Sequence, residues 1–300
     1  MQKSFYRTWA HIALFAANFI YGINFTIVKA VMPAWIKPMA LVSFRSITTA
    51  LLFWITSFFL PKEKVDKKDL LNLFLFSFLG VVANQTLFLA GLALTTPINS
   101  SIIMAINPVA AFVFTAIILK ERISLIRGAG LAVGLGGILM LILHEGRPDL
   151  SSATFVGNIY TLINTLSWAL FTVLIKRMLE KYKPVTVMKW IFTFGMLTNV
   201  PLGYHQWSVM DWSSIPFFAW MAITFVVIFA TYLGYLLITF GLKRLSPTVV
   251  SSYTYTQPIV AAILASFLGQ DSISVLKIFS ALLIFAGVFL VGRQQNQAAL

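Results

Sequence analysis

Amide and aromatic side chains lie within long apolar runs of this sequence, at positions where polar groups are rare. Asn18 and Asn164 each lie about ten residues into such a run, which at about 1.5 Å per residue places both near the centre of a bilayer. A polar side chain at that depth is costly unless it faces water or the protein interior, so it is a candidate for function. Because amides donate and accept hydrogen bonds, the predicted chemistry is reversible binding of a small molecule. The candidate binding residues are Asn18, Asn84, Gln85, Asn107, Asn164, Trp168, Tyr232, Tyr235, Tyr253 and Gln257.

One polar and aromatic stripe follows the apolar run 154–176. At about 100° per residue, four of its side chains fall within about 80° of one another on a helix. They are Thr161, Asn164, Trp168 and Thr172. We interpret the stripe as a cavity wall in which Trp168 stacks on or encloses the substrate. The alternative is interhelical hydrogen bonding by Asn and Thr with Trp as packing. We favour the cavity because Trp168 lies too deep for the aromatic belt of a membrane interface.

Two prolines lie near the centres of the apolar runs 97–119 and 247–268. Pro108 and Pro258 lack an N–H group, so each frees the carbonyl four residues earlier and bends its helix. Asn107 and Gln257 directly precede them and would present amides beside each bend. We predict hinges that also expose polar groups to a transport pathway. The alternative is a static kink whose free carbonyl is satisfied by neighbouring helices.

Two basic residues, Arg45 and Lys189, fall within apolar runs, where a charge is expensive. One hypothesis makes Arg45 the partner of a substrate carboxylate. We favour the alternative, a structural Arg near the lipid head groups or bonded to a helix end. Lys189 is close enough to the membrane surface to extend its ammonium group there. All nine Asp and Glu residues lie in connections or at run ends, so facilitated diffusion, exchange or coupling without a buried acid is expected.

The sequence offers no catalytic constellation. It has no cysteine, which removes thiol catalysis, disulfides and Cys-based metal sites. It also shows neither an acid pair suited to hydrolysis nor a nucleophile beside a base. We therefore expect no enzymatic activity, no metal and no cofactor. The rival class, an intramembrane enzyme or a lipid-handling protein, would need such a constellation at one interface.

Helices within a membrane must position these residues. Of the 300 residues, 59% are hydrophobic and only 10% are charged, whereas a soluble domain has about a quarter of its residues charged. A membrane span needs about 20 apolar residues. We therefore predict an all-α integral membrane protein with ten transmembrane helices. The predicted spans are 9–32, 39–60, 70–93, 97–119, 126–143, 154–176, 185–204, 214–241, 247–268 and 274–292.

The net charge of +13 indicates topology rather than a nucleic-acid partner. With the N-terminus in the cytoplasm, sixteen of the 22 Lys and Arg residues fall on the cytoplasmic side and four on the other. The positive-inside rule then predicts that both termini are cytoplasmic. We expect a multi-pass protein of the cell membrane (the cytoplasmic or inner membrane) that binds no nucleic acid.

The chain contains an internal repeat. An offset of 150 residues aligns 91–141 with 241–291 without a gap and pairs Pro108 with Pro258. An offset of 146 pairs Asn18 with Asn164 in the earlier parts of the halves. We predict two domains, residues 1–150 and 151–300, with five spans each. Because five is odd, the second repeat enters the membrane from the opposite side, which is typical of alternating-access transporters.

Several motifs resemble a known family. The first half contains YGINF at 21–25 and LKERIS at 119–124, followed by glycines from Gly128 to Gly137. The second half contains SWAL at 167–170 and similar glycines from Gly269 to Gly287. Over essentially the whole chain, once per half, this resembles the EamA family of the drug/metabolite transporter superfamily, although Tyr21 stands where the family commonly has Trp. The resemblance implies a ten-helix carrier of small metabolites, often an exporter of amino acids, and does not identify the substrate.

Together these observations predict an exporter that works by alternating access around a midplane cavity. An aromatic, amide-rich lining without acids suits a neutral or zwitterionic substrate, so hydrophobic or aromatic amino acids are the expected cargo. Nucleotide-sugars or other metabolites are one alternative, although a phosphorylated substrate would need several Lys or Arg at the midplane. A passive channel is the other. The expected partners are the small molecule and the lipid bilayer, and the expected assembly is a monomer or a weak homodimer.

Overall fold

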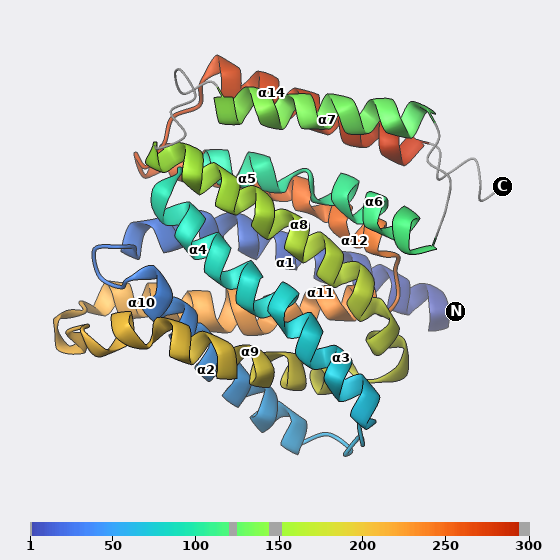
Figure 1. Cartoon of the computed structure of the whole chain (residues 1–300), viewed down its shortest axis with the longest axis vertical. Helices are drawn as coiled ribbons and strands as arrows, with labels where there is room; N and C mark the ends of the chain where they lie inside the picture. Colours follow the sequence, from blue (N-terminus) through green and yellow to red (C-terminus); the bar gives the residue numbers. More distant parts are fainter. Residues whose placement is uncertain (1, 120–124, 144–151, 294–300) are drawn as a thin grey trace.

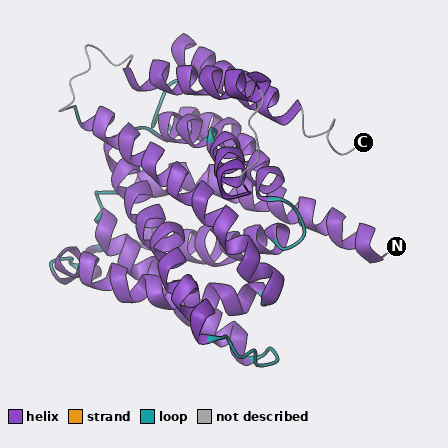
Figure 2. Ribbon diagram, turned by 45° about the vertical axis from the view of Figure 1, so that its right-hand side comes forward, coloured by secondary structure: helices purple, strands orange, loops and turns teal. Residues whose placement is uncertain are grey.

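The computed structural model describes residues 2–119, 125–143 and 152–293. It is helical, and the described residues contain no β-strand (Figures 1 and 2). Two π-helical segments, η1 and η3, and two short 3-10 segments, η2 and η4, interrupt or join the α-helices. The elements are α1 (Gln2–Val31), α2 (Pro38–Phe58), α3 (Lys67–Ser77), η1 (Phe78–Ala83), α4 (Asn84–Leu94), α5 (Pro97–Met104), α6 (Asn107–Leu119), α7 (Leu125–Leu143), α8 (Ala153–Lys181), α9 (Pro184–Ser208), η2 (Trp212–Ser214), α10 (Phe217–Phe225), η3 (Val226–Leu233), α11 (Gly234–Leu242), α12 (Pro247–Ser252), η4 (Tyr253–Tyr255), α13 (Thr256–Phe267) and α14 (Val275–Arg293). The predicted all-α class is confirmed.

Seven helical stretches of the described chain are long and apolar enough to cross a membrane. They are Tyr6–Val31, Pro38–Phe58, Lys67–Leu94, Pro97–Ile118, Ala153–Lys181, Pro184–Ser208 and Phe217–Leu242. Two shorter apolar helices, Gly128–Gly137 and Val275–Gly287, fall in the predicted spans 126–143 and 274–292. The predicted span 247–268 is interrupted by η4. The layout of ten spans therefore stays a prediction.

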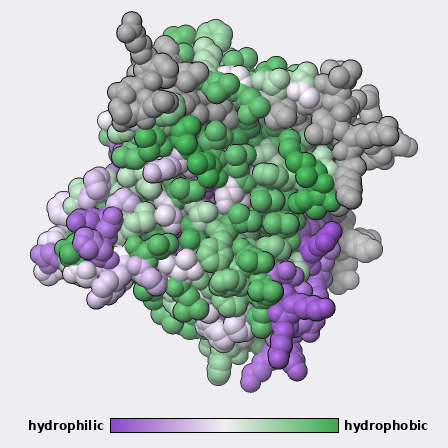
Figure 3. Space-filling view, viewed as in Figure 1, coloured by the Kyte–Doolittle hydropathy of each residue, from purple (hydrophilic) through white to green (hydrophobic). Residues whose placement is uncertain are grey.

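The surface of the protein suits contact with lipid. Hydrophobic residues cover most of the face in Figure 3, and hydrophilic residues gather at two opposite edges, one near the start of α3 and one near α10. Large apolar side chains such as Ile55, Leu197 and Ile263 are more than half exposed, at 57%, 61% and 62%. A soluble monomer rarely exposes apolar surface of this extent.

Prolines begin four of the helices. Pro38, Pro97, Pro184 and Pro247 stand at the first position of α2, α5, α9 and α12, where the missing N–H would have no intrahelical partner. The predicted starts of these helices are correct to within a residue. Helices α8 and α9 end at 181 and 208 rather than at the predicted 176 and 204, because polar residues can continue a helix beyond its apolar stretch.

Two of the predicted spans are not continuous helices. The run 97–119 is broken at Ala105 and Ile106, between α5 and α6, and the run 247–268 passes through η4. Each break lies a few residues before a central proline, Pro108 or Pro258, whose nitrogen cannot donate to the carbonyl four residues back. The helices are thus interrupted where bends were expected. Whether these points act as hinges stays a prediction.

The two π-helical segments were not expected from the sequence. The offset of 150 residues carries 78–83, which is η1, onto 228–233 within η3. In η3 the Thr231 hydroxyl donates to the Val226 carbonyl, five residues back, at 2.6 Å. Wide turns of this kind are often found at functional sites.

The principal helix contacts join the two halves of the sequence. Helix α2 packs on α9, α4 packs on α8, and α7 pairs with α14 at one edge of the molecule (top of Figure 1). Gly91 of α4 and Gly157 of α8 allow their two helices to approach closely, since a Cβ on Gly91 would lie 2.9 Å from the Gly157 carbonyl oxygen. A Cβ on Gly157 would lie 2.8 Å from the Gly91 carbonyl oxygen. Small residues let membrane helices pack this tightly.

Three sequence-based expectations fall outside the described residues. They concern the motif residues 120–124, the domain boundary between 150 and 151, and the C-terminal end 294–300. The division into domains 1–150 and 151–300 is therefore still a prediction.

Candidate functional site

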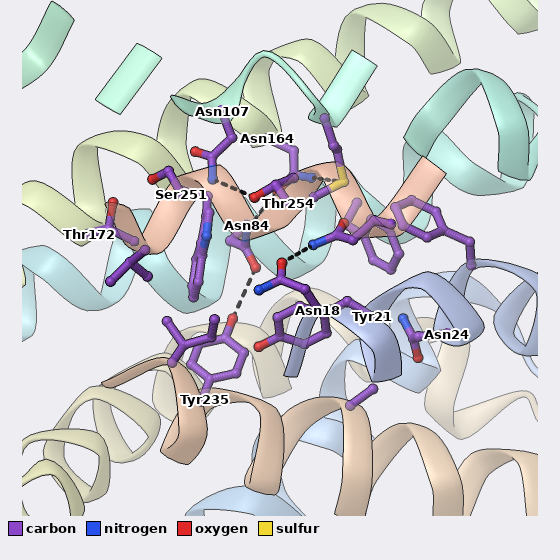
Figure 4. A pocket seen from close by; sticks show the side chains of 18 of the residues that line it. Asn18, Tyr21, Asn24, Asn84, Asn107, Asn164, Thr172, Tyr235, Ser251 and Thr254 are labelled. Carbon is purple, nitrogen blue, oxygen red and sulfur yellow. Dashed lines mark hydrogen bonds between the residues drawn. The ribbon is translucent and has the colours of Figure 1, made fainter. Parts of the chain in front are cut away.

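A cavity lies among the helices, with an empty volume of about 690 Å³ including space open to solvent (Figure 4). Residues from both halves of the chain form its wall, on α1, α2, α4, α5, α6, α8, η3, α11, α12, η4 and α13. The lining residues are Asn18, Tyr21, Asn24, Phe25, Arg45, Asn84, Phe88, Met104, Asn107, Asn164, Trp168, Thr172, Ala230, Tyr235, Ile238, Val250, Ser251, Thr254 and Gln257.

Asn18 and Gln257 connect α1 with α13 inside the cavity. The Gln257 amide nitrogen donates to Asn18 Oδ1 at 2.7 Å, and the Asn18 amide nitrogen donates to the Leu14 carbonyl at 2.8 Å. Both residues are buried, Gln257 at 3% exposure and Asn18 at 2%. The other amide oxygen, Gln257 Oε1, has no hydrogen-bond partner among the described residues. A lining residue thus holds a buried acceptor without a partner.

A second polar group joins α4, α8 and α11. The Asn84 amide nitrogen donates to Asn164 Oδ1 at 2.7 Å. The Tyr235 hydroxyl lies 2.9 Å from Asn84 Oδ1 and 2.7 Å from the Gly80 carbonyl oxygen (Figure 4). The neighbouring Asn107 donates to the Thr254 hydroxyl at 3.2 Å, and its Oδ1 has no partner in the described chain. Amide side chains from five helices, α1, α4, α6, α8 and α13, therefore line one cavity.

Aromatic rings close part of the wall. Trp168 packs edge-on against Tyr235, with ring centroids 5.2 Å apart and planes at 76°, and it lies 5.3 Å from the Phe171 ring. Tyr235 also meets Phe192 edge-on at 4.9 Å. Such packing fixes the indole while leaving one side of it toward the cavity.

Arg45 lines the cavity and is only 4% exposed. Its Nε donates to the Thr231 hydroxyl of η3 at 2.9 Å, and its Nη1 has no partner among the residues that the structure describes. Tyr21 and Tyr235 line the same cavity. This side chain is therefore directed to the interior and not to the lipid head groups.

Three predicted binding residues lie outside the lining. Gln85 is fully buried beside Asn84, which does line the cavity. The Tyr253 hydroxyl is 2.6 Å from His11 Nδ1, and the Tyr232 hydroxyl is 2.6 Å from the Thr56 hydroxyl. Pro108 and Pro258 are also absent from the lining, although the residue before each of them is part of it.

Other lining residues were not anticipated, and helical spacing could have indicated them. Tyr21 lies three residues after Asn18, and Thr254 lies three residues before Gln257, so each shares a helix face with a predicted residue. Ser251 precedes Thr254 by the same interval. Asn24 continues the face of Tyr21, whose hydroxyl is buried without a partner in the described residues.

Charged side chains gather away from the cavity. Lys181 of α8 bridges Asp66 and Asp69 at the start of α3, at 2.5 and 2.6 Å. Nearby, burial of Glu63 opposes its ionisation, but hydrogen bonds from the Thr186 side chain and the Lys183 backbone lower its pKa overall. None of the described acids lines the cavity, and no cluster of three or more His, Asp or Glu side chains suited to a metal occurs among the residues searched.

Long apolar helices around a polar internal cavity define a multi-pass membrane protein. The sequence profile of the EamA-like transporter family matches residues 8–143 and again residues 155–293. The chain belongs to this family, as the resemblance in its motifs predicted. Its members are transporters and not enzymes.

Relatives across two kingdoms carry transporter or related names. The chain is 24% identical over 281 residues to "Uncharacterized transporter YyaM" of Bacillus subtilis (strain 168), covering 93% of this chain and 92% of that protein. It is 22% identical over 318 residues to "WAT1-related protein At3g18200" of Arabidopsis thaliana, covering 95% and 82%. A solved crystal structure at 15% identity superposes with a TM-score of 0.67, covering 96% of this chain and 98% of that one. The two proteins therefore share a fold despite their low sequence identity.

Proposed function

We propose that the chain is a carrier that exports small metabolites, with hydrophobic or aromatic amino acids as its substrates. The observation that carries the proposal is the cavity whose wall both halves build from amides and aromatic rings. Amides bind polar groups of either hydrogen-bonding sense, and the rings accept an apolar side chain. A site of this composition fits a small molecule that is polar at one end and apolar at the other.

Transport would proceed by alternating access between two inverted repeats of five spans, residues 1–150 and 151–300. The double family match and the pairing of η1 with η3 support this layout. The breaks before Pro108 and Pro258 supply two related points at which the helices around the cavity could bend. A cavity at the interface of two such repeats is the usual location of a substrate site in secondary transporters.

The membrane setting follows from charge. The basic residues at 62, 64, 67 and 68 precede or begin α3, at one of the polar edges in Figure 3. Placing that edge in the cytoplasm puts both termini inside by the positive-inside rule. We therefore propose the cytoplasmic membrane as the location and a monomer or weak homodimer as the assembly.

Counterflow in proteoliposomes tests the carrier. Substrate on the far side of the membrane should accelerate uptake of a radiolabelled amino acid, and a passive channel would show no such acceleration. Screening labelled amino acids with and without a pH gradient would identify the cargo. A nucleotide-sugar carrier is less consistent with a cavity that has one guanidinium in its described lining.

Two cavity variants test the site. Trp168→Ala and Gln257→Ala should each reduce counterflow by about tenfold, since each removes contacts or a hydrogen bond worth about 1.4 kcal/mol. Trp35→Ala is the matched control, because Trp35 pairs with Phe218 outside the cavity lining. Unchanged counterflow in both cavity variants at normal membrane expression would show that the cavity is not the substrate site.

A further inference from the structure

A buried cation lines the cavity without an anion to balance it. Arg45 is 4% exposed, and its one hydrogen bond in the described structure is to a neutral hydroxyl, that of Thr231. Arg keeps its charge in any protein setting. An unbalanced buried charge is costly, and buried charges are as a rule paired. No described acid lies in the lining, so the balancing charge must come from elsewhere.

At the corresponding position in the other repeat no cation is present. The offset of 146 carries Arg45 of α2 onto Ile191 of α9, and the offset of 150 carries Val81 of η1 onto Thr231 of η3. Ile191 and Val81 are both fully buried in one hydrophobic cluster. The same helix meets the same kind of π-helical segment in both halves, and in one half apolar side chains suffice. Filling the space between the two helices therefore does not by itself account for the charge.

We propose that Arg45 binds the carboxylate of the transported substrate, which is therefore a small molecule with one carboxylate. The inference rests on the proposed carrier function. Arg45 Nη1 and the Tyr21 hydroxyl both lack partners in the described chain and belong to residues of the lining, so each has a hydrogen left to donate to a carboxylate. Charge-assisted bonds of this type are the strong ones. A single guanidinium cannot neutralise a substrate with several phosphates.

The cavity wall also holds amide oxygens without partners. In Figure 4, Asn107 lies across the cavity from Tyr21 and Tyr235. Asn107 Oδ1 and Gln257 Oε1 have no partners among the described residues. Either oxygen can accept a hydrogen bond from the ammonium group of an amino acid whose carboxylate is bound by Arg45. A monocarboxylate without the ammonium group should bind by the same anchor and more weakly.

Ligand-induced thermal shifts and titration calorimetry on the purified full chain test the anchor. The probes are L-phenylalanine, 3-phenylpropionate, the other proteinogenic L-amino acids, and L-phenylalaninamide, which lacks the carboxylate. Wild-type protein should be stabilised by carboxylates and not by the amide. In Arg45→Met the affinity for the carboxylate should fall by about 10- to 100-fold, the loss expected for a hydrogen bond to a charged group. Arg45→Lys should give an intermediate loss.

A structural role for Arg45 predicts the opposite pattern. The corresponding contact, between α9 and η1, is apolar, so ligand-free Arg45→Met should be at least as thermostable as the wild type. Ile191→Met is the control and should leave binding unchanged. A destabilised or unfolded Arg45→Met, unchanged affinity in Arg45→Met or Arg45→Lys, or no stabilisation by any carboxylate probe would overturn the proposal. Carboxylate binding without counterflow would refute the carrier and keep the anchor. Counterflow of an uncharged substrate that is insensitive to Arg45→Met would do the reverse.

Discussion

Two helix crossings in this protein, α2 with η3 and α9 with η1, correspond in the two repeats but contain different side chains. Helix α2 meets η3 through the Arg45–Thr231 hydrogen bond, whereas α9 meets η1 through apolar residues that include Ile191 and Val81. Each crossing joins one half of the chain to the other. The features that both crossings share are the ones that we attribute to folding. A side chain that differs between them is a candidate for function. The charge at one crossing is the clearest such difference in the transmembrane region.

At the N-terminal ends of α2 and α9 the charged partner belongs to α9 and the neutral one to α2. The backbone N–H of Met39 in α2 donates to the neutral Gln206 side chain at 2.9 Å. The N–H of Lys183, which caps α9, donates to the carboxylate of Glu63 at 3.0 Å. Helix α2 therefore has its charge inside the protein and a neutral cap at its start, and α9 has the reverse. Charge at a solvated helix end is inexpensive, while charge in the cavity wall is not.

Placing a charge in the apolar crossing should have the largest effect. Ile191→Arg would bury a cation among fully buried apolar residues, and we expect a loss of about 3–5 kcal/mol in stability, or failure to fold. Thermal unfolding in detergent and the yield of monodisperse protein measure it, with Ile191→Met as the control. If Ile191→Arg is as stable as the wild type, both crossings tolerate charge and the contrast between them disappears.

The packing at the two crossings also differs one turn along. Gly195 of α9 corresponds to Thr49 of α2, and a Cβ on Gly195 would lie too close to the Val81 side chain. We expect Gly195→Ala to cost about 1–3 kcal/mol through overpacking. Thr49→Ala should cost less, because the buried Thr49 hydroxyl has no partner in the described residues. Equal unfolding temperatures for the two variants would contradict the tighter packing at η1.

A double-mutant cycle should isolate the polar pair. Thr231→Val removes the acceptor of Arg45 Nε and should cost about 1–2 kcal/mol. In the Arg45→Met background the same change should cost much less, because no guanidinium is left without a partner. Thermal unfolding of the four proteins gives the coupling. Additive effects would mean that the hydrogen bond contributes nothing to the crossing.

The smallest expected effect is the loss of stability when Glu63, at the start of α9, is protonated at acidic pH. The pKa of Glu63 is lowered in the folded protein, so its contribution is present above the unfolded pKa, about 4.3, and is lost as the pH falls through the folded value. Acidification should therefore weaken the start of α9 and leave the Gln206 cap of α2 unchanged. The loss should stay below about 1 kcal/mol because the carboxylate is partly solvated. Unfolding temperatures of Glu63→Gln and wild type should converge at acidic pH, and a constant difference would refute this.

Much of the fold was predictable because apolar length and proline position report directly on membrane helices. The helix starts at Pro38, Pro97, Pro184 and Pro247 were placed to within a residue. The η1 and η3 segments were not, since a widened turn leaves no mark in the apolar pattern and depends on local hydrogen bonding such as that of Thr231. The depth of Asn18, Asn164 and Gln257 indicated a shared level in the membrane, and the structure brings all three to one cavity.

Side-chain direction was harder to infer than depth. Asn84 and Gln85 are adjacent in sequence, yet only Asn84 lines the cavity. Tyr253 and Tyr232 turn instead to His11 and Thr56. Neighbouring positions on a helix point about 100° apart, so a small error in helix rotation decides which of two adjacent polar residues reaches the cavity.

The sequence by itself determined an all-helical membrane protein, its family, its internal repeat and the level at which its polar residues lie, because these depend on composition and spacing along one chain. Only the tertiary structure decided which polar side chains meet and which stay without a partner. Arg45 illustrates the difference. Its depth suggested a residue near the head groups, but the packing of α2 on η3 turns it into the cavity, because the direction of a buried side chain is set by the helices packed around it.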